Sequence, residues 1–496
     1  MIHRPLFAAL AAFALTLPTA AAEKPVTEAE LADHIDVLAS DAFVGRAPGG
    51  EGEYRTIAYL TGEWARAGLE PVPGSATPWL QPVPLVERRA LTGTATFKAG
   101  GRSIALEPDS LLLSSRDAAV KFDALPVTFV GHGVDATGKV TADVRGKVAL
   151  MLLDQPPYGS NLPRSRERRR LLGDAGATAV LTVEGGGLSW AAVKAAFADP
   201  TTTMLANTAG SGPAMSGFLS QGAFDLLVTR ADRKAADLVT AAAQPDFMGI
   251  DLNLTADIAG TSAIRQFESH NILAKLPGGK PDGRAIVIMG HWDHLGLCAP
   301  EGAADRICNG AVDNASGIAV MIEVAKRLAQ GPRPDRDIYF LATTAEENGL
   351  LGAYHFADNP VVPLDAITVA LNIDTIAIAP RGTPVATIGR GSAPHDALVA
   401  DVAAKLGRKL DTDGEADAFV QRQDGWAFGA KGVTSLMVGG SFSDMALLQG
   451  FLAGDYHGPG DQPGKPYPLG GAAEDADLHV ALARAFGSVK RWPGTP

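Results

Sequence analysis

The stretch AIVIMGHWDHLG, residues 285–296, joins a short apolar run to two histidines and an aspartate. The run 285–290 is rich in β-branched residues, which is typical of a buried strand. Three similar runs follow: DIYFLATT (337–344), AITVALNID (366–374) and TSLMVGG (434–440). Helical patterns such as ASGIAVMIEVAKRLAQG (315–331) lie between them. Apolar strands that alternate with helices predict an α/β fold, with a mixed, mostly parallel sheet sandwiched by helices.

Polar side chains gather where these predicted strands end. His291 and Asp293 follow the first strand, Glu346 and Glu347 follow the second, and Asp374 closes the third. In open α/β sheets, sites form in the crevice beyond the carboxyl ends of the strands. We therefore expect these side chains to share one crevice.

Two further residues extend this set. Asp313, in GAVDNASG (310–317), stands just before a predicted helix, and His457 lies in the Gly/Pro-rich loop GDYHGPGD (454–461). A mixture of carboxylates and imidazoles is typical of a dinuclear site for a borderline metal such as zinc. The sequence therefore predicts a metal site at the carboxyl edge of the sheet.

Each of these residues also has an ordinary structural interpretation. Asp313 and Asp374 are suited to helix caps, because Asx side chains accept hydrogen bonds from free backbone N–H groups. Glu346 and Glu347 would be stable as a solvated pair that opens a helix, and a single His457 is most simply a loop residue. The metal site is favoured because unrelated caps would not be expected at the ends of several neighbouring strands.

Strand alternation separates the residues of the opening motif. If the strand 285–290 continues briefly, His291 and Asp293 share one side, while Trp292 and His294 face elsewhere. We therefore predict that His291 is a metal ligand and that Asp293 supports an imidazole from behind. His294 is predicted to be structural.

The chain between 116 and 255 has a different character. Strand-like runs occur at 127–134, 147–153, 177–183 and 224–230. The basic segment SRERRRLLGDAGA (165–177) is predicted to be a helix with a solvated face rather than a phosphate site. Residues 116–255 therefore read as a β-rich insert domain, and residues 23–115 and 256–496 as the catalytic domain around it.

The N-terminus predicts export. Residues 1–22 combine a cation, an apolar run and small residues, which is the layout of a cleavable signal peptide. The apolar run is shorter than the roughly 20 residues that a membrane span needs. We therefore expect a periplasmic or secreted protein with no membrane attachment after signal cleavage. In an exported chain, Cys298 and Cys308 are expected to form a disulfide.

Bulk properties exclude other classes of protein. A hydrophobic content of 46% with 20% charged residues indicates a folded, globular chain rather than a disordered one. The formal net charge of −12 argues against a nucleic-acid-binding surface or an anionic-membrane surface.

Five motifs, in this order and spacing, resemble the co-catalytic dizinc exopeptidase family, which includes secreted bacterial aminopeptidases, aminopeptidase Y and glutamate carboxypeptidase II. They are GHWDHLG (290–296), GAVDNASG (310–317), TTAEENGLLGA (343–353), LNID (371–374) and DYHGPGD (455–461). The resemblance extends to LASDAFVGRAPGGEGE (38–53), and the insert resembles the protease-associated domain that many of these enzymes carry.

The resemblance implies two Zn²⁺ ions and a role for each site residue. His291 and Asp374 would hold one ion, Glu347 and His457 the other, and Asp313 would bridge them. Glu346 resembles the general base, Tyr456 the tyrosine that stabilises the tetrahedral intermediate, and Asp293 a supporting carboxylate.

The expected function is zinc-dependent hydrolysis of N-terminal residues from peptide substrates. Carboxypeptidase or dipeptidase activity uses the same chemistry and stays open, as does a non-catalytic binding protein on the same scaffold. The sequence departs from many relatives at Asp424, which is followed by Gly425 where they have a serine–aspartate–histidine run. It departs again at Thr375, where they carry a larger residue.

Overall fold

The computed structural model describes residues 24–72, 77–159, 162–205, 211–389 and 391–493. Its centre is the strand β11 (Ala285–His291), which lies between β14 (Asp337–Thr343) and β15 (Ile367–Asn372), parallel to both. Beyond β15, β17 (Ser435–Gly439) is also parallel, whereas the next strand β16 (Ala386–Ile388) is antiparallel. On the other side, β10 (Ile250–Leu276) pairs with β14 in the antiparallel sense. The predicted mixed, mostly parallel sheet is confirmed.

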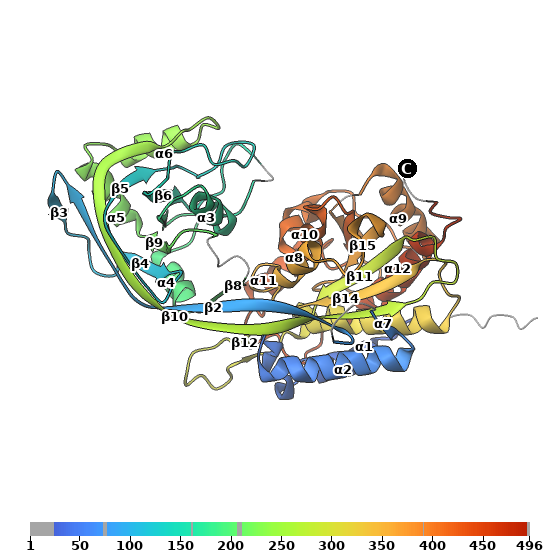
Figure 1. Cartoon of the computed structure of the whole chain (residues 1–496). Coiled ribbons are helices and arrows are strands. Elements are labelled where there is room, and N and C mark those ends of the chain that lie inside the picture. Colours follow the sequence, from blue (N-terminus) through green and yellow to red (C-terminus); the bar gives the residue numbers. More distant parts are fainter. Residues whose placement is uncertain (1–23, 73–76, 160–161, 206–210, 390, 494–496) are drawn as a thin grey trace, which may run out of the picture.

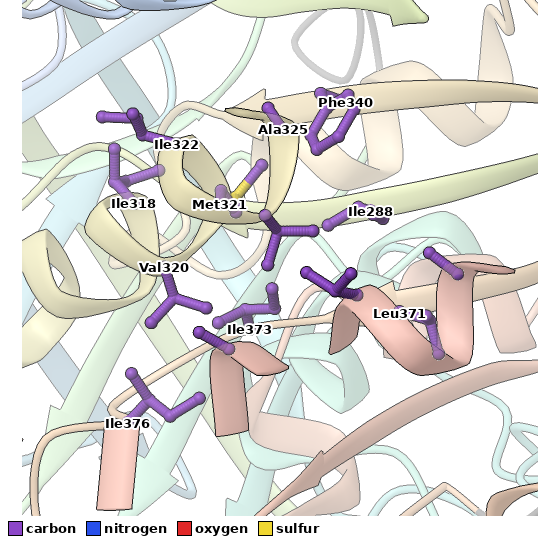
Figure 2. Packing of buried hydrophobic residues seen from close by; sticks show 14 of the residues in the cluster. Ile288, Ile318, Val320, Met321, Ile322, Ala325, Phe340, Leu371, Ile373 and Ile376 are labelled. Carbon is purple, nitrogen blue, oxygen red and sulfur yellow. The ribbon is translucent and has the colours of Figure 1, made fainter. Parts of the chain in front are cut away.

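Helices cover both faces of this sheet. One face carries α1 (Glu28–Leu38), α2 (Glu51–Ala67), α7 (Gly317–Gln330), α9 (Ala393–Lys405) and α12 (Leu469–Gly487), and the other carries α8 (Leu351–Asp358) and α10 (Gly425–Gly429). The helix α11 (Met445–Ala453) lies near the carboxyl edge. Figure 2 shows how α7 meets the sheet: Met321 and Ala325, four residues apart on the helix, lie toward Ile288 and Phe340.

The insert and the catalytic domain are joined by two long strands. β2 (Leu80–Ala99) pairs along most of its length with β10, and both run from one domain to the other (Figure 1). The insert sheet then has the order β5 (Ala119–Phe129), β6 (Val148–Leu152), β7 (Ala179–Val183), β9 (Met215–Leu219) and β4 (Leu111–Ser115). Short strands complete the set: β1 (Glu70–Pro71), β3 (Arg102–Ile104), β8 (Thr201–Met204), β12 (Gly296–Leu297) and β13 (Ile307–Cys308). Because β2 and β10 are continuous, the division at residues 116 and 255 stays a prediction.

The insert also contains helices, one of which is the predicted basic helix; the prediction was wrong for one run and for one arginine. These helices are α3 (Ser165–Asp174), α4 (Trp190–Ala198), α5 (Gln221–Arg230) and α6 (Ala235–Ala242). The run 224–230 is therefore helix, not strand: Phe224, Leu227 and Val228 are buried at helical spacing, and Ser220 caps the start. On α3, Arg168 is not solvated but fully buried, where it donates hydrogen bonds to four backbone carbonyls.

Export of the chain predicts a disulfide and a cleaved signal peptide, and the structure tests only the first of these. The disulfide Cys298–Cys308 is present and closes the hairpin of β12 and β13. The predicted signal peptide, residues 1–22, lies outside the described residues. Within the described part of the chain, no helix is both long and apolar enough to span a membrane.

A buried histidine on α12 makes the stability of the fold depend on pH. His479 is fully buried, and its burial lowers its pKa to about 4. Between about pH 4 and 6.5 the unfolded chain binds more protons than the folded one, so the free energy of unfolding falls as the pH drops through this window.

We expect the wild type to lose about 2 kcal/mol more unfolding free energy than His479→Leu between pH 7 and pH 5. Urea unfolding of both proteins, stripped of metal, at the two pH values measures this difference. The same pH dependence in both proteins would contradict it.

Candidate metal centre

The parallel register of the sheet brings the predicted site residues to one edge. His291 is the last residue of β11 and lies opposite Thr343, the last residue of β14. Glu346 and Glu347 follow two and three residues after Thr344, and Asp374 follows the end of β15. Because neighbouring parallel strands end at the same level, residues far apart in the sequence meet there.

Asp313 lies at the centre of this arrangement. Its Oδ1 is 3.2 Å from Nε2 of His291, and its Oδ2 is 3.4 Å from Nε2 of His457. Asp313 is nearly fully buried, just before α7, and the peptide bond that follows it is cis. Each oxygen of one carboxylate therefore faces a different imidazole.

A further carboxylate stands beside each of these two histidines. Oδ1 of Asp374 lies 3.4 Å from Nε2 of His291, and Oε2 of Glu347 lies 2.8 Å from Nε2 of His457. The hydroxyl of Thr375 donates to Oδ1 of Asp374 over 2.8 Å, which fixes that carboxylate. The two histidines are thus flanked in the same way, with Asp313 shared between them.

This donor set fits zinc. Among the described residues, potential ligand atoms fall within 4.8 Å of one another in three groups, and one of these is His291, Asp313 and Asp374. Imidazole nitrogen and carboxylate oxygen are ligands that zinc accepts. Carboxylates outnumber histidines in the cluster, and buried carboxylates without compensating charge are costly. Bound cations would supply that charge.

Glu346 lies in the same region, where it forms one of the three candidate metal groups together with His291 and Glu347. Burial, together with the charge of Glu347, holds the pKa of Glu346 well above its usual range. Its backbone N–H donates to Oδ1 of Asp293 over 3.1 Å. A carboxyl group with a raised pKa is suited to accept and return a proton.

Asp293 contacts the ring of His291 mainly through its backbone and only distantly through its carboxylate. The backbone carbonyl of Asp293 is 3.1 Å from Nδ1 of His291, and its Oδ1 is 3.9 Å from the same nitrogen. Asp293 is fully buried, its Oδ2 has no hydrogen-bond partner within the described residues, and burial raises its pKa to about 8. Its assignment as a supporting carboxylate stays a prediction.

His294 is the residue that sequence reasoning missed. Its Nδ1 lies 2.6 Å from Oε1 of Glu347, and it forms one of the candidate metal groups together with Asp313 and Glu347. The prediction that it faces away was wrong because β11 ends at His291, so strand alternation does not extend to position 294. Strand alternation therefore could not predict the direction of this side chain. The only indication in the sequence that residue 294 belongs to the site was that it is a histidine, a residue type that binds metals.

Tyr456 borders a cleft beside the cluster. Its ring stacks on that of His457 with centroids 3.7 Å apart, and its hydroxyl lies 3.3 Å from Nη2 of Arg422. The polar lining of the cleft includes Asp313, Glu346, Asp374, Arg422 and Tyr456, and its apolar lining is Phe419, Met437, Phe442, Leu448 and Leu452. The cleft therefore has one apolar wall next to the candidate metal ligands.

Comparison with known proteins relates the chain to a family of peptidases. Residues 271–470 match the model of peptidase family M28. A probable zinc metalloprotease from Pyrenophora tritici-repentis is 30% identical over 154 residues, which cover 30% of this chain and 31% of that protein. The chain spans less than half the length of the curated relatives that it matches.

Two solved structures share the fold across almost the whole chain. An aminopeptidase from Aneurinibacillus sp. strain AM-1 is 19% identical, with a TM-score of 0.54 and coverage of 93% of this chain and 94% of that one. A zinc aminopeptidase from Bacillus subtilis is 20% identical, with a TM-score of 0.50 and coverage of 95% and 98%. At these identities the likeness concerns the fold.

Proposed function

We propose that this chain is a zinc-dependent exopeptidase, an aminopeptidase that removes N-terminal residues from peptides, because its residues 271–470 match the model of peptidase family M28. One observation carries the proposal: the two oxygens of Asp313 face His291 and His457 separately. A carboxylate in that position suits a pair of metal ions that act on one water and one carbonyl. The fungal relatives named as zinc metalloproteases and the aminopeptidase folds are consistent with it.

The five predicted ligands divide into two sets around Asp313. His291 and Asp374 would hold one zinc ion, Glu347 and His457 would hold the other, and Asp313 would bind both. Zinc at such a site supplies Lewis acidity, which lowers the pKa of water and polarises the scissile carbonyl.

The remaining residues handle protons and charge. Glu346 takes a proton from the attacking water and returns it to the leaving amine, a task that its raised pKa favours. Burial also raises the pKa of Tyr456, so that its hydroxyl stays protonated and donates to the developing oxyanion. Arg422 donates a hydrogen bond to that hydroxyl and so orients it.

The cleft suggests the class of terminal residue. Phe419, Met437 and Phe442 line it beside Glu346, together with Leu448 and Leu452. An apolar side chain that enters this cleft leaves water and gains contact with these residues, which favours binding. We therefore expect a preference for substrates whose terminal residue is apolar.

Arg422 favours a second candidate function, carboxypeptidase or dipeptidase activity. Its side chain lines the cleft and, among the described residues, contacts the hydroxyl of Tyr456 and the ring of Phe419 rather than a carboxylate. A guanidinium in that position is suited to bind a substrate carboxylate in a bidentate manner. A non-catalytic binding protein is disfavoured, because a buried cluster of polar groups with this composition is costly to keep without a role.

The insert resembles a protease-associated domain, and we propose that it shapes the cleft. Arg166 on α3 donates to the backbone carbonyls of Asn348, directly after Glu347, and of Thr202. The insert therefore reaches the loop that carries two predicted site residues. The exported location also stays a proposal, supported by the apolar N-terminal segment and by the disulfide.

The activity is tested by measuring hydrolysis of aminoacyl-anilides and of N-blocked dipeptides, before and after treatment with a chelator. We expect cleavage of anilides with an unblocked apolar residue, its loss after chelation, and its recovery when zinc is added. Cleavage confined to N-blocked dipeptides, with a KM that rises in Arg422→Gln, would establish the carboxypeptidase alternative. Zinc-bound protein that cleaves neither class would contradict both.

A further inference from the structure

Arg46 lies in the N-terminal motif 38–53, to which the proposed function assigns no role. Its side chain is 1% exposed, and all its hydrogen bonds go to backbone carbonyls. Nε donates to Trp292 O over 2.8 Å, and Nη1 donates to Leu38 O over 2.7 Å and to Asn309 O over 2.6 Å. Nη2 donates to Gly310 O over 2.9 Å. One guanidinium therefore joins three segments of the chain.

Two of those segments carry predicted metal ligands. Trp292 stands directly between His291 and Asp293, and residues 309 and 310 lead into Asp313. The backbone carbonyl of Arg46 also accepts from the N–H of His294, at 3.4 Å. Arg46 thus ties the carboxyl end of β11 to the segment that presents Asp313, although it touches neither carboxylate nor imidazole.

Asp461 binds the backbone N–H groups of the same segment, whereas Arg46 binds its backbone carbonyls. Its carboxylate accepts from the N–H of Val312 over 2.8 Å and from the N–H of Asp313 over 3.0 Å. Its backbone carbonyl accepts from the N–H of Ala311 at 3.2 Å. Asp461 is fully buried and lies four residues after His457 in the sequence. Two carbonyls of segment 309–313 therefore accept from a guanidinium, and two of its amides donate to a carboxylate.

We propose that Arg46 and Asp461 are positioning residues that hold Asp313 so that each of its oxygens faces a different histidine. This inference rests on the proposed dinuclear zinc site. A guanidinium is planar, with donors in a fixed fork, so it sets the separation of the carbonyls that it binds. Residues that orient metal ligands typically change metal affinity about 10- to 100-fold when they are removed. Arg46 and Asp461 would act on zinc through the backbone of segment 309–313.

The chain provides matched controls for both residues. Arg168 is also fully buried and donates to four backbone carbonyls, but it lies in the insert. Asp475 is fully buried and accepts from the N–H of Gly440, away from the cluster. Arg168→Met and Asp475→Asn therefore remove comparable buried hydrogen bonds without touching segment 309–313.

The test compares Arg46→Met, Arg46→Lys and Asp461→Asn with these controls in the full-length protein. Zinc per chain is measured by elemental analysis, zinc affinity by competition with a chromophoric chelator, and ligand geometry by the absorption spectrum of the cobalt-substituted protein. We expect zinc affinity to fall about 10- to 100-fold and the cobalt spectrum to change in the three site variants. The controls should lower the melting temperature but keep zinc affinity within about twofold of the wild type.

The outcomes are separable. Folded Arg46→Met and Asp461→Asn proteins that keep both ions, wild-type affinity and the wild-type cobalt spectrum overturn the inference. The same loss of zinc in the controls also overturns it, because general destabilisation would then account for the effect. If Arg46→Met does not fold, Arg46→Lys and Asp461→Asn decide. A wild-type protein that binds fewer than two zinc ions would instead contradict the proposed site itself.

Discussion

Glu346→Gln is expected to lower kcat by about 10²- to 10⁴-fold while zinc content stays at the wild-type value. Gln keeps the size of the side chain but cannot take a proton from water or return it to the leaving amine. Glu346 is not a predicted metal ligand, whereas its neighbour Glu347 is. Loss of the Glu346 carboxylate should therefore lower kcat, and loss of the Glu347 carboxylate should lower the zinc content. Steady-state kinetics on the best anilide substrate, with elemental analysis of the same samples, measures both quantities.

The control for this prediction is Glu268→Gln, which changes an exposed carboxylate on β10. Its kcat and zinc content should match those of the wild type. If Glu346→Gln hydrolyses the substrate as fast as the wild type, Glu346 is not the general base. A large fall in zinc content would make it a ligand instead.

Asp313→Asn is expected to reduce bound zinc from two ions to one or none and to abolish most of the activity. The substitution preserves the volume of the side chain, but an amide has a single oxygen and cannot bind two cations as a carboxylate does. The electrostatic stabilisation that a metal provides amounts to several kcal/mol, so its loss corresponds to a decrease of about 10³-fold or more in kcat/KM.

Asp475→Asn serves as the comparison, because Asp475 is a buried carboxylate that faces Arg408 rather than the cluster. Its zinc stoichiometry should equal that of the wild type. An Asp313→Asn enzyme that retains two ions and near-normal kcat/KM is the result that excludes a bridging role for Asp313.

Much of the fold could be predicted because its strongest signals are local. The runs 285–290, 337–344, 366–374 and 434–440 all coincide with strands of the central sheet. A strand that is buried on both faces of a sheet has apolar side chains at nearly every position, because neither face is in contact with water. The run 224–230 shows the limit of this reasoning, because a short apolar segment of similar composition became the helix α5.

Errors in the site came from positions where the regular geometry stops. His294 was predicted to face away by extending strand alternation beyond the end of β11, but in the structure it contacts Glu347. Arg168 was expected in a solvated row, but α3 packs against the insert sheet and buries it. In both cases the periodicity of the sequence predicted the helix or strand correctly, but it could not predict which other parts of the chain surround it.

The sequence by itself determined which carboxylates, and which histidine, follow the carboxyl ends of the parallel strands. It thereby predicted that these side chains lie in one crevice. This was possible because parallel strands bring their carboxyl ends to one edge, whatever the loops do. Only the tertiary structure decided that each oxygen of Asp313 faces its own histidine, that Phe419 and Arg422 border the same cleft, and that Arg46 supports segment 309–313. These contacts join residues that are far apart in the sequence, such as Arg46 and Gly310. They depend on backbone carbonyls and on the conformations of loops, and neither of these produces a periodic pattern of residue types in the sequence.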